Sequence, residues 1–421
     1  MPICFELKKG GLAKINEFLR FLLLKVHRYC IILAKNTLIL KKAFILCIFD
    51  FRVFFVPINS FRNYVGTLFI AQVLTKKKQL MIIDLISDTV TRPTPQMMQA
   101  MQTASVGDDV FKMDPTVNAL QEKAAKMFGM EDALFFPSGT MANQAAIKLH
   151  TQPGDKLICD QYAHVYNYEG GGAAFNSGVT CKLINGSRGM FSAAQLQEAV
   201  SGRSDIHVPF SRLVCIENTT NKGGGACWNF SELVKIQKIT KEHHLAFHLD
   251  GARLFNALVA KKETPIQYGA LFDTISICLS KGLGAPIGSI LLGSKEAIAK
   301  ALRIRKLFGG AMRQAGFLAA AGIYALDHHI ERLAEDHRKA KEIGTVLESV
   351  AFVSKIEPIE TNIVIFYVIE EIGADAFIQK MKDKNILLTP MGEGRIRIVT
   401  HLDYTSEMHE IVLTTLREFS Y

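Results

Sequence analysis

The sequence predicts an α/β protein built on a large, doubly wound and mostly parallel sheet, and three stretches support this prediction. Residues 245–249 and 274–279 are short, mostly apolar runs that end in polar or glycine-rich residues, as buried strands do. The segment between them can hold a crossover, so the two strands can lie parallel. A third run, 133–136, leads through a tight turn at 137–140 into a helix-like stretch. Because ligands gather at the carboxyl ends of parallel strands, the residues that follow these runs form the candidate site.

An acid and a lysine follow two of these strands. Asp250 lies in the segment His248–Arg253, and Lys281 lies in the glycine-flanked segment Leu279–Gly284. Pyridoxal phosphate (PLP) needs a lysine that holds its aldehyde as a Schiff base and a carboxylate that keeps its pyridine nitrogen protonated. Asp250 and Lys281 can supply both groups. For either residue alone, a salt bridge at a strand end or a surface lysine is the alternative, so the prediction depends on further elements.

Two upstream elements support a PLP site. Ser138, Gly139 and Thr140 stand at the start of a helix, where free N–H groups, the helix dipole and two hydroxyls can hold a dianionic phosphate, although simple N-capping would explain the same residues. His164 precedes aromatic residues and a glycine run, so its imidazole could stack on the pyridine face and move protons near neutral pH. A buried structural histidine is the alternative. Together the four elements favour PLP.

Further segments occur in the order found in low-specificity L-threonine aldolases. They are Asp84–Pro93, Val106–Val110, Ser138–Met141, Gly309–Gly316 and Arg395–His401, together with the two segments that hold Asp250 and Lys281. The chain resembles this family over roughly residues 81–421. The resemblance implies the PLP-dependent transferase fold type I, with a large PLP-binding domain over residues 81–325 and a smaller C-terminal α+β domain over residues 326–421.

The resemblance also implies a role for each matching residue. The implied catalytic residues are Lys281, His164 and Asp250. The implied cofactor contacts are Ser138, Gly139 and Thr140 to the phosphate, His164 to the ring face, Asp250 to the pyridine nitrogen, Arg253 to the ring hydroxyl, and Ser280, Lys281 and Arg313. The implied substrate contacts are Ser87, Arg253 and Arg397, since a guanidinium fork suits a carboxylate. No metal is assigned.

The activity implied by the resemblance is aldol cleavage of L-threonine, L-allo-threonine or a related β-hydroxy amino acid to glycine and an aldehyde. This reaction belongs to threonine catabolism and glycine biosynthesis, and a homotetramer follows by analogy. A PLP-dependent β-eliminating lyase could use nearly the same residues, and a non-catalytic PLP-binding or membrane-associated protein is the alternative from another class. Product analysis distinguishes them, because β-elimination releases ammonia and a keto acid.

Three positions depart from the family pattern. Thr220 stands where the family usually has a histidine associated with the substrate hydroxyl, Phe111 replaces a tyrosine, and Ile86 replaces an arginine. A threonine hydroxyl cannot act as a base near neutral pH. We therefore expect His164 or an ordered water to serve as the base, with cleavage of threonine weakened or shifted to another β-hydroxy amino acid.

Residues 1–80 differ in composition from the rest of the chain. They contain 14 Lys and Arg but 3 Asp and Glu, whereas residues 81–421 contain 35 and 37. The sequence pI of about 9.0 therefore comes from this leader, and the remainder shows no charge pattern for nucleic acid. The longest uncharged run of the leader, 63–75, has 13 residues, fewer than the ~18–20 of a spanning helix. An amphipathic segment at a membrane surface is the alternative, but we expect no membrane contact and interpret the leader as a mis-assigned start upstream of Met81.

Cysteine and histidine usage favours a reducing compartment without a metal site. Of 8 cysteines, five lie in residues 81–421, and no Cys-x-x-Cys pair occurs. Cysteines in apolar stretches commonly pack as small hydrophobes, which fits the cytoplasm. His243, His244 and His248 come without carboxylates at metal-binding spacing.

Overall fold

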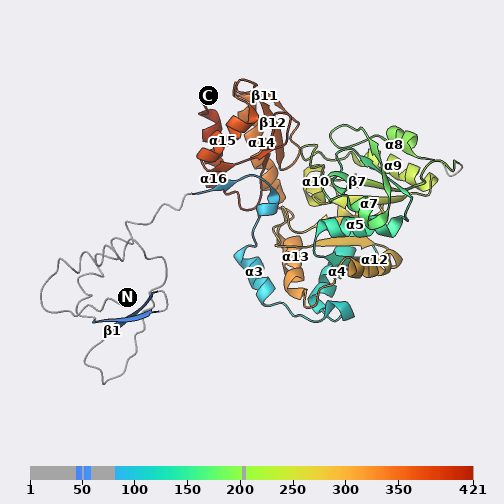
Figure 1. Cartoon of the computed structure of the whole chain (residues 1–421), viewed down its shortest axis with the longest axis horizontal. Helices are drawn as coiled ribbons and strands as arrows, with labels where there is room; N and C mark the ends of the chain where they lie inside the picture. The colour runs from blue at the N-terminus through green and yellow to red at the C-terminus, as the bar shows by residue number, and fades with distance from the viewer. Residues whose placement is uncertain (1–43, 50–51, 58–80, 202–204, 421) are drawn as a thin grey trace, which may run out of the picture. The chain divides into compact units, whose positions relative to one another are not determined.

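The computed structural model describes residues 44–49, 52–57, 81–201 and 205–420 (Figure 1). In the first of two separate units, strands β1 (Phe44–Phe49) and β2 (Arg52–Pro57) pair in antiparallel fashion. The other predictions about the leader concern residues outside the described ones. Among the described residues, no helix is long and apolar enough to cross a membrane.

A seven-stranded sheet forms the centre of the second unit. Its strands lie in the order β4-β10-β9-β8-β7-β5-β6, and only β10 runs antiparallel to its neighbours. The strands are β4 (Asp132–Phe136), β5 (Lys156–Asp160), β6 (Thr180–Ile184), β7 (Ser211–Glu217), β8 (Ala246–Gly251), β9 (Thr274–Cys278) and β10 (Ser289–Gly293). The predicted mostly parallel α/β sheet is confirmed.

Helices cover both faces of this sheet because alternate strand residues enter different cores. Ala133 and Phe135 of β4 pack in the main core with α4 (Pro115–Phe128), whereas Leu134 and Phe136 pack with α5 (Gly139–His150) and α12 (Lys295–Leu307). The other helices around this sheet are α3 (Pro95–Gln102), α6 (His164–Asn167), α7 (Gly172–Ser177), α8 (Ala193–Ala199), α9 (Phe230–Glu242), α10 (Leu254–Lys261), α11 (Pro265–Gly269) and α13 (Gly316–His328).

A second sheet and core follow in the C-terminal part of the chain. The antiparallel order is β11-β12-β15-β14, with helices beside the sheet (Figure 1). Its elements are α14 (Leu333–Glu348), β11 (Val353–Ile356), β12 (Ile363–Val368), α15 (Ala374–Asp383), β14 (Thr389–Pro390), β15 (Arg395–Val399) and α16 (Ser406–Arg417).

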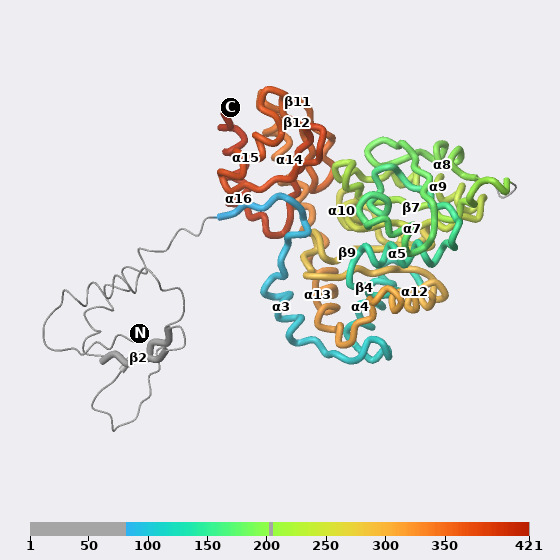
Figure 2. The backbone as a smooth tube through the Cα atoms, in the orientation of Figure 1, coloured from blue at the N-terminus to red at the C-terminus, as the bar shows by residue number. Residues whose placement is uncertain are grey.

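The first residues of the second unit join this C-terminal core. Strand β3 (Ile83–Asp84) pairs in parallel with β13 (Ile386–Leu387), and Ile83 and Leu85 are buried with the C-terminal residues. The chain then runs on to α3 (Figure 2). The segment that follows β3 therefore lies between the two cores, where it can supply side chains to a site shared by both.

Candidate active site

The carboxyl ends of three parallel strands bring the candidate site together. Glu217 ends β7 and lies opposite Asp250 near the end of β8, and Asp250 lies opposite Ser276 of β9. Lys281 follows β9 in the loop that leads to β10. Two acids and the lysine thus meet at one edge of the sheet, as expected from the topology.

Asp250 is buried and held at both oxygens. Its Oδ2 accepts a hydrogen bond from Nδ2 of Asn143 at 2.9 Å, and its Oδ1 accepts one from the backbone N–H of Ala252 at 3.1 Å. Asn143 comes from α5 on one face of the sheet. The carboxylate therefore has a fixed orientation before any ligand binds.

Lys281 is half-buried and belongs to a loop tied to the N-terminal segment. Its backbone oxygen accepts a hydrogen bond from the Thr91 hydroxyl at 2.9 Å, and its Nζ lies 3.8 Å from Sγ of Cys278. No carboxylate among the described residues forms a salt bridge with this side chain.

His164 is held among acids beside Asp250. Its Nδ1 lies 2.9 Å from Oε1 of Glu169, and its backbone N–H donates to Oε2 of Glu217 at 3.0 Å. Ligand atoms of His164, Glu169 and Asp250 lie within 4.8 Å of one another, close enough in principle for a metal ion, although all three groups are already hydrogen-bonded.

The charges and burial around His164 raise the pKa values of two groups. Burial opposes protonation of the imidazole, but its hydrogen bond to Glu169 and the charges of Asp250, Glu169 and Glu217 outweigh burial and raise the pKa of His164. Burial, with repulsion from Asp250, raises the pKa of Glu217 to about 7. Groups that change protonation near neutral pH are typical of sites that move protons.

Arg253 forms a buried, two-pronged ion pair with Asp88. Its Nε and Nη2 donate to the two Asp88 oxygens at 2.8 and 2.7 Å, and both side chains are almost fully buried. Asp88 also accepts a hydrogen bond from Nδ2 of Asn362 at 3.3 Å. Two of the three guanidinium nitrogens are thereby used within the protein, so a ring hydroxyl or substrate contact would depend on Nη1.

Arg397 contacts the backbone immediately before Ser87. Arg397, on β15, donates from Nη1 to Oδ1 of Asn221 at 2.8 Å and from Nη2 to the backbone oxygen of Ile86, the residue before Ser87, at 3.0 Å. Its Nε is buried without a hydrogen-bond partner. Burial and the charge of Arg253 lower the pKa of Arg397. Both partners are neutral, so the guanidinium charge is not balanced by a directly bonded carboxylate.

The start of α5 contains the three residues expected to hold a phosphate. The Ser138 hydroxyl caps the helix by accepting from the N–H of Met141 at 3.2 Å, and Ser138 and Thr140 are exposed. A Cβ on Gly139 would lie 2.6 Å from Sγ of Cys278, so the close approach to the end of β9 requires glycine here. The helix start thus lies next to the strand end from which the Lys281 loop departs.

Comparison with known proteins agrees with this arrangement. The family described as beta-eliminating lyase matches residues 84–371. The low specificity L-threonine aldolase of Escherichia coli (strain K12) is 41% identical over 339 residues, which are 80% of this chain and 99% of the relative. The probable low-specificity L-threonine aldolase 2 of Arabidopsis thaliana is 38% identical over 338 residues, 79% of this chain and 95% of the relative. This chain belongs to the beta-eliminating lyase family, together with these low-specificity L-threonine aldolases.

Solved structures show the fold of this family. A threonine aldolase of Leishmania major has a TM-score of 0.70 at 21% identity, covering 80% of this chain and 98% of that one. A structure of SPT with PLP has a TM-score of 0.61 at 16% identity, covering 86% and 97%. The predicted PLP-dependent fold type I is confirmed.

Of the three positions that depart from the usual pattern of the family, Thr220 and Phe111 make no described hydrogen bond to Asp250 or Lys281, whereas the backbone oxygen of Ile86 accepts from Arg397. The hydroxyl of Thr220 donates to the backbone oxygen of Arg188 at 2.9 Å, and the residue is buried. Arg313, a predicted cofactor contact, is 57% exposed at its side chain and pairs with Asp108 at 2.8 Å. The structure does not bring Arg313 to Asp250 or Lys281 through any described hydrogen bond. Phe111, three residues after Asp108, is 68% exposed.

Several polar residues of the site were missed by sequence reasoning. They are Asp88, Asn143, Glu169, Glu217 and Asn221. Glu169 stands in the same aromatic and glycine-rich run as His164, and Asn143 is one of two polar residues, with Gln144, among the buried residues of α5. A polar residue on a buried helix face needs a partner, so this position was the available signal.

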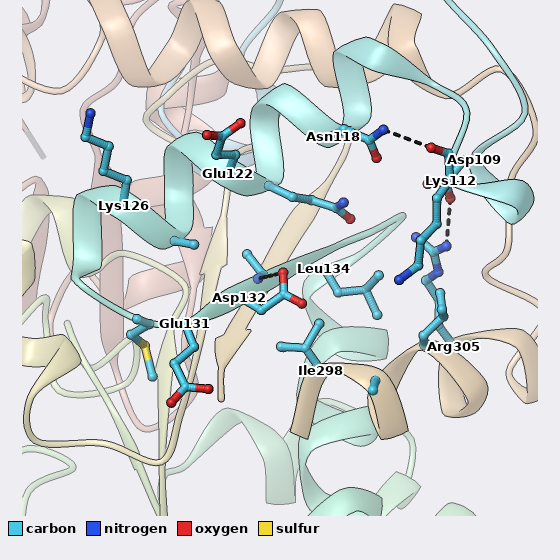
Figure 3. Close-up of a pocket in the computed structure, with 16 residues that line it drawn as sticks. Asp109, Lys112, Asn118, Glu122, Lys126, Glu131, Asp132, Leu134, Ile298 and Arg305 are labelled. Atoms are coloured by element: carbon cyan, nitrogen blue, oxygen red, sulfur yellow. Dashed lines mark hydrogen bonds and ion pairs between the residues drawn. The ribbon is translucent and has the colours of Figure 1, made fainter. Parts of the chain in front are cut away.

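The prominent hollow shown in Figure 3 is not this site. It has a volume of about 540 Å³ and lies between α4, β4 and α12, with Glu122, Asp132, Ile298 and Arg305 among its lining residues. Arg305 there donates to Asp109 at 2.7 Å and to the backbone oxygen of Phe135 at 2.6 Å. None of the predicted site residues lines it.

Proposed function

We propose that this protein is a PLP-dependent threonine aldolase, a carbon–carbon lyase that cleaves L-threonine, L-allo-threonine or a related β-hydroxy amino acid to glycine and an aldehyde. The observation that carries the proposal is the meeting of Asp250, His164 and Lys281 at one sheet edge, within a chain of the family described above. Both PLP binding and the choice of reaction can be derived from these groups and their neighbours.

The residues present fit PLP. Ser138, Gly139 and Thr140 would hold the phosphate, because an exposed helix start offers N–H groups and a favourable dipole to an anion. Asp250 would face the pyridine nitrogen, and Lys281, next to Ser280, would hold the aldehyde carbon. When bound, PLP supplies an electron sink for the cleavage of a bond at the substrate α-carbon.

The substrate carboxylate would bind Arg397 with Ser87 beside it. The two present partners of Arg397, Asn221 and the backbone of Ile86, are neutral acceptors, so an incoming carboxylate would add the missing charge. Anchoring the carboxylate also fixes rotation about the α-carbon. The orientation set in this way would select which bond at the α-carbon is cleaved. Arg253, locked onto Asp88, would contribute from its remaining nitrogen.

A proton must leave the substrate β-hydroxyl, and His164 is the group best placed to take it. With Nδ1 engaged by Glu169, the ring nitrogen that remains for substrate is Nε2. The acids around His164 raise its pKa and so make it a stronger base. Thr220, turned to the backbone of Arg188, cannot perform this step. An ordered water held by His164 would serve the same purpose.

The test is product analysis. Purified full-length protein with PLP should release aldehyde and glycine from threonine, allo-threonine, serine or phenylserine, with His164→Asn as the matched variant. If none of the four substrates yields an aldehyde, the proposal is contradicted. β-Elimination is the second candidate, favoured by Thr220 in place of the usual histidine; ammonia with a keto acid would identify it.

We further propose a homo-oligomer, a tetramer by analogy, that acts in the cytoplasm. Phe111, Met113 and Leu307 are 68%, 69% and 70% exposed, and a second copy would cover such large apolar side chains. Light scattering after size-exclusion chromatography should give a mass above that of one chain. The five cysteines of the described residues are free, as expected in a reducing compartment, and subcellular fractionation tests this assignment.

A further inference from the structure

A row of buried polar side chains runs behind Asp250 through the sheet. Nδ2 of Asn143 donates to Oδ2 of Asp250 and to Oε1 of Glu169, each at 2.9 Å. The Asn143 side-chain oxygen lies 2.6 Å from Oγ of Ser276 and 3.3 Å from Nε2 of His248. All five side chains are buried. One amide therefore has all of its hydrogen-bonding capacity engaged, with two carboxylates on one end and two donors on the other.

The carboxylates fix the direction of the bonds that the Asn143 amide makes. A carboxylate accepts only, so the nitrogen of the Asn143 amide faces the acids and its oxygen must accept. Ser276 and Nε2 of His248 therefore donate to that oxygen. Burial lowers the pKa of His248 to about 4, so the ring carries one proton near neutral pH. With that proton on Nε2, Nδ1 accepts from the Thr274 hydroxyl at 2.9 Å, the nearer of its two Thr274 neighbours, since the backbone oxygen lies at 3.2 Å.

The row continues from His248 to the other end of α5. Thr274 Oγ1 lies 2.9 Å from Nδ1 of His248, to which it donates, and 2.9 Å from Nε2 of His150, from which it accepts. Each member of the row therefore donates a hydrogen bond to the next, beginning at His150 and ending at the two acids of the candidate site. Aligned bonds of this kind polarise one another and resist rotation of any member.

We propose that Asn143, oriented by Ser276 and His248, is the positioning residue that holds Asp250 and Glu169 in the orientation needed for the cofactor. The inference deepens the proposed function and rests on it only for the identity of the cofactor. Asp250 would face the pyridine nitrogen, and Glu169 holds His164. Both cofactor contacts therefore share this amide, while Nε2 of Gln144 also donates to the other Glu169 oxygen, Oε2, at 2.6 Å.

The physical reason is charge. Two buried carboxylates close to each other repel, and one of them would turn away or take up a proton unless donors lie between them. Two charge-assisted N–H bonds from a single, non-rotating amide meet this requirement without adding a charge. A lysine or arginine in the same place would instead neutralise the acid that must face the ring nitrogen.

The experiment measures PLP binding by apoenzyme of the full chain. Ser276→Ala removes a donor to Asn143 but touches neither carboxylate. Ser276→Thr keeps the hydroxyl. Ser289→Ala is the matched control, because Ser289 is equally buried on the neighbouring strand and donates to the backbone oxygen of Ile277 at 2.6 Å instead. Asn143→Leu removes the amide at similar size. The dissociation constant of PLP, its visible absorbance band and the thermal midpoint of the apoenzyme are recorded for each variant.

We expect Ser276→Ala to weaken PLP binding about fivefold, the effect of one hydrogen bond, and Asn143→Leu about a hundredfold or more, with a shifted visible band in both. Ser276→Thr should restore binding, and Ser289→Ala should stay within about twofold of the wild type even if its thermal midpoint falls equally. Wild-type PLP affinity in Ser276→Ala, or equal weakening in Ser289→Ala, would overturn the proposal. These outcomes do not depend on whether the wild-type protein releases an aldehyde, so failure of the proposed function would be recognised separately.

Discussion

Neutralising Asp88 should destabilise the protein and remove part of its sensitivity to acid. Burial alone opposes ionisation of Asp88, but the charge and hydrogen bonds of Arg253, with help from Lys281 and Asn362, outweigh it and lower the pKa of Asp88 from 3.8 to about 2. At about 1.4 kcal/mol per pKa unit, the difference corresponds to about 2.5 kcal/mol of stability. Because the pKa in the folded state is depressed, this stability is present above about pH 4 and is lost as the pH falls towards about 2.

The variant Asp88→Asn removes this contribution and leaves Arg253 buried without its counter-charge. Breaking a buried pair in this way costs about 3–5 kcal/mol at neutral pH. Urea unfolding followed by circular dichroism, from pH 7 down to pH 3, should therefore show a lower midpoint at pH 7 and a shallower loss of stability with acid than in the wild type.

The control is a second buried pair of the same type. Asp109 pairs with Arg305 at 2.7 Å, but burial raises the pKa of Asp109 despite that partner. The pair therefore adds no stability that acid removes, and Asp109→Asn should not flatten the pH profile. A wild-type midpoint at pH 7 in Asp88→Asn, or an unchanged acid slope, would refute the reasoning.

Three further predictions concern the site. Lys281→Ala should abolish the visible band of bound PLP and the covalent label left by borohydride, and a label retained elsewhere would refute the assignment. Arg397→Lys keeps the charge but loses the fork, so KM for threonine should rise about tenfold or more with a smaller change in kcat; an unchanged KM argues against carboxylate binding there. Glu217→Gln removes an acid that raises the pKa of His164, so the acidic limb of the kcat/KM profile should move to lower pH if deprotonated His164 is the base. If the acidic limb of the Glu217→Gln profile is unchanged, that limb reports the ionisation of a group other than His164.

Local pattern accounts for the parts of the fold that the sequence predicted. The apolar runs before Asp250 and Lys281 form β8 and β9, and the stretch after Pro137 turns into α5 through the cap at Ser138. Each of these features depends on neighbours within a few residues, such as alternation, a turn residue or a capping hydroxyl. Once the strands are parallel neighbours, their carboxyl ends must meet.

Which residues form ion pairs or hydrogen bonds with residues far away in the sequence could not be predicted from such local patterns. Asp88 and Arg253 are 165 positions apart, Asn143 and Asp250 are 107 apart, and Arg397 reaches Asn221 across 176. The sequence identified Arg253 as a ligand contact but gave no sign that Asp88 would occupy two of its nitrogens. Arg313 likewise matched a family position, yet within one chain it pairs with Asp108 at the surface.

The sequence by itself determined the α/β class, the strand ends that carry Asp250 and Lys281, and the helix start at Ser138, because these follow from periodicity and capping within short segments. Only the tertiary structure decided that residues 83–85 join the C-terminal core and that one buried amide, Asn143, holds two acids. Such pairings provide hydrogen-bond partners for buried charged and polar groups. The packing of helices and strands decides which donor comes within about 3 Å of which acceptor, and local sequence does not show this.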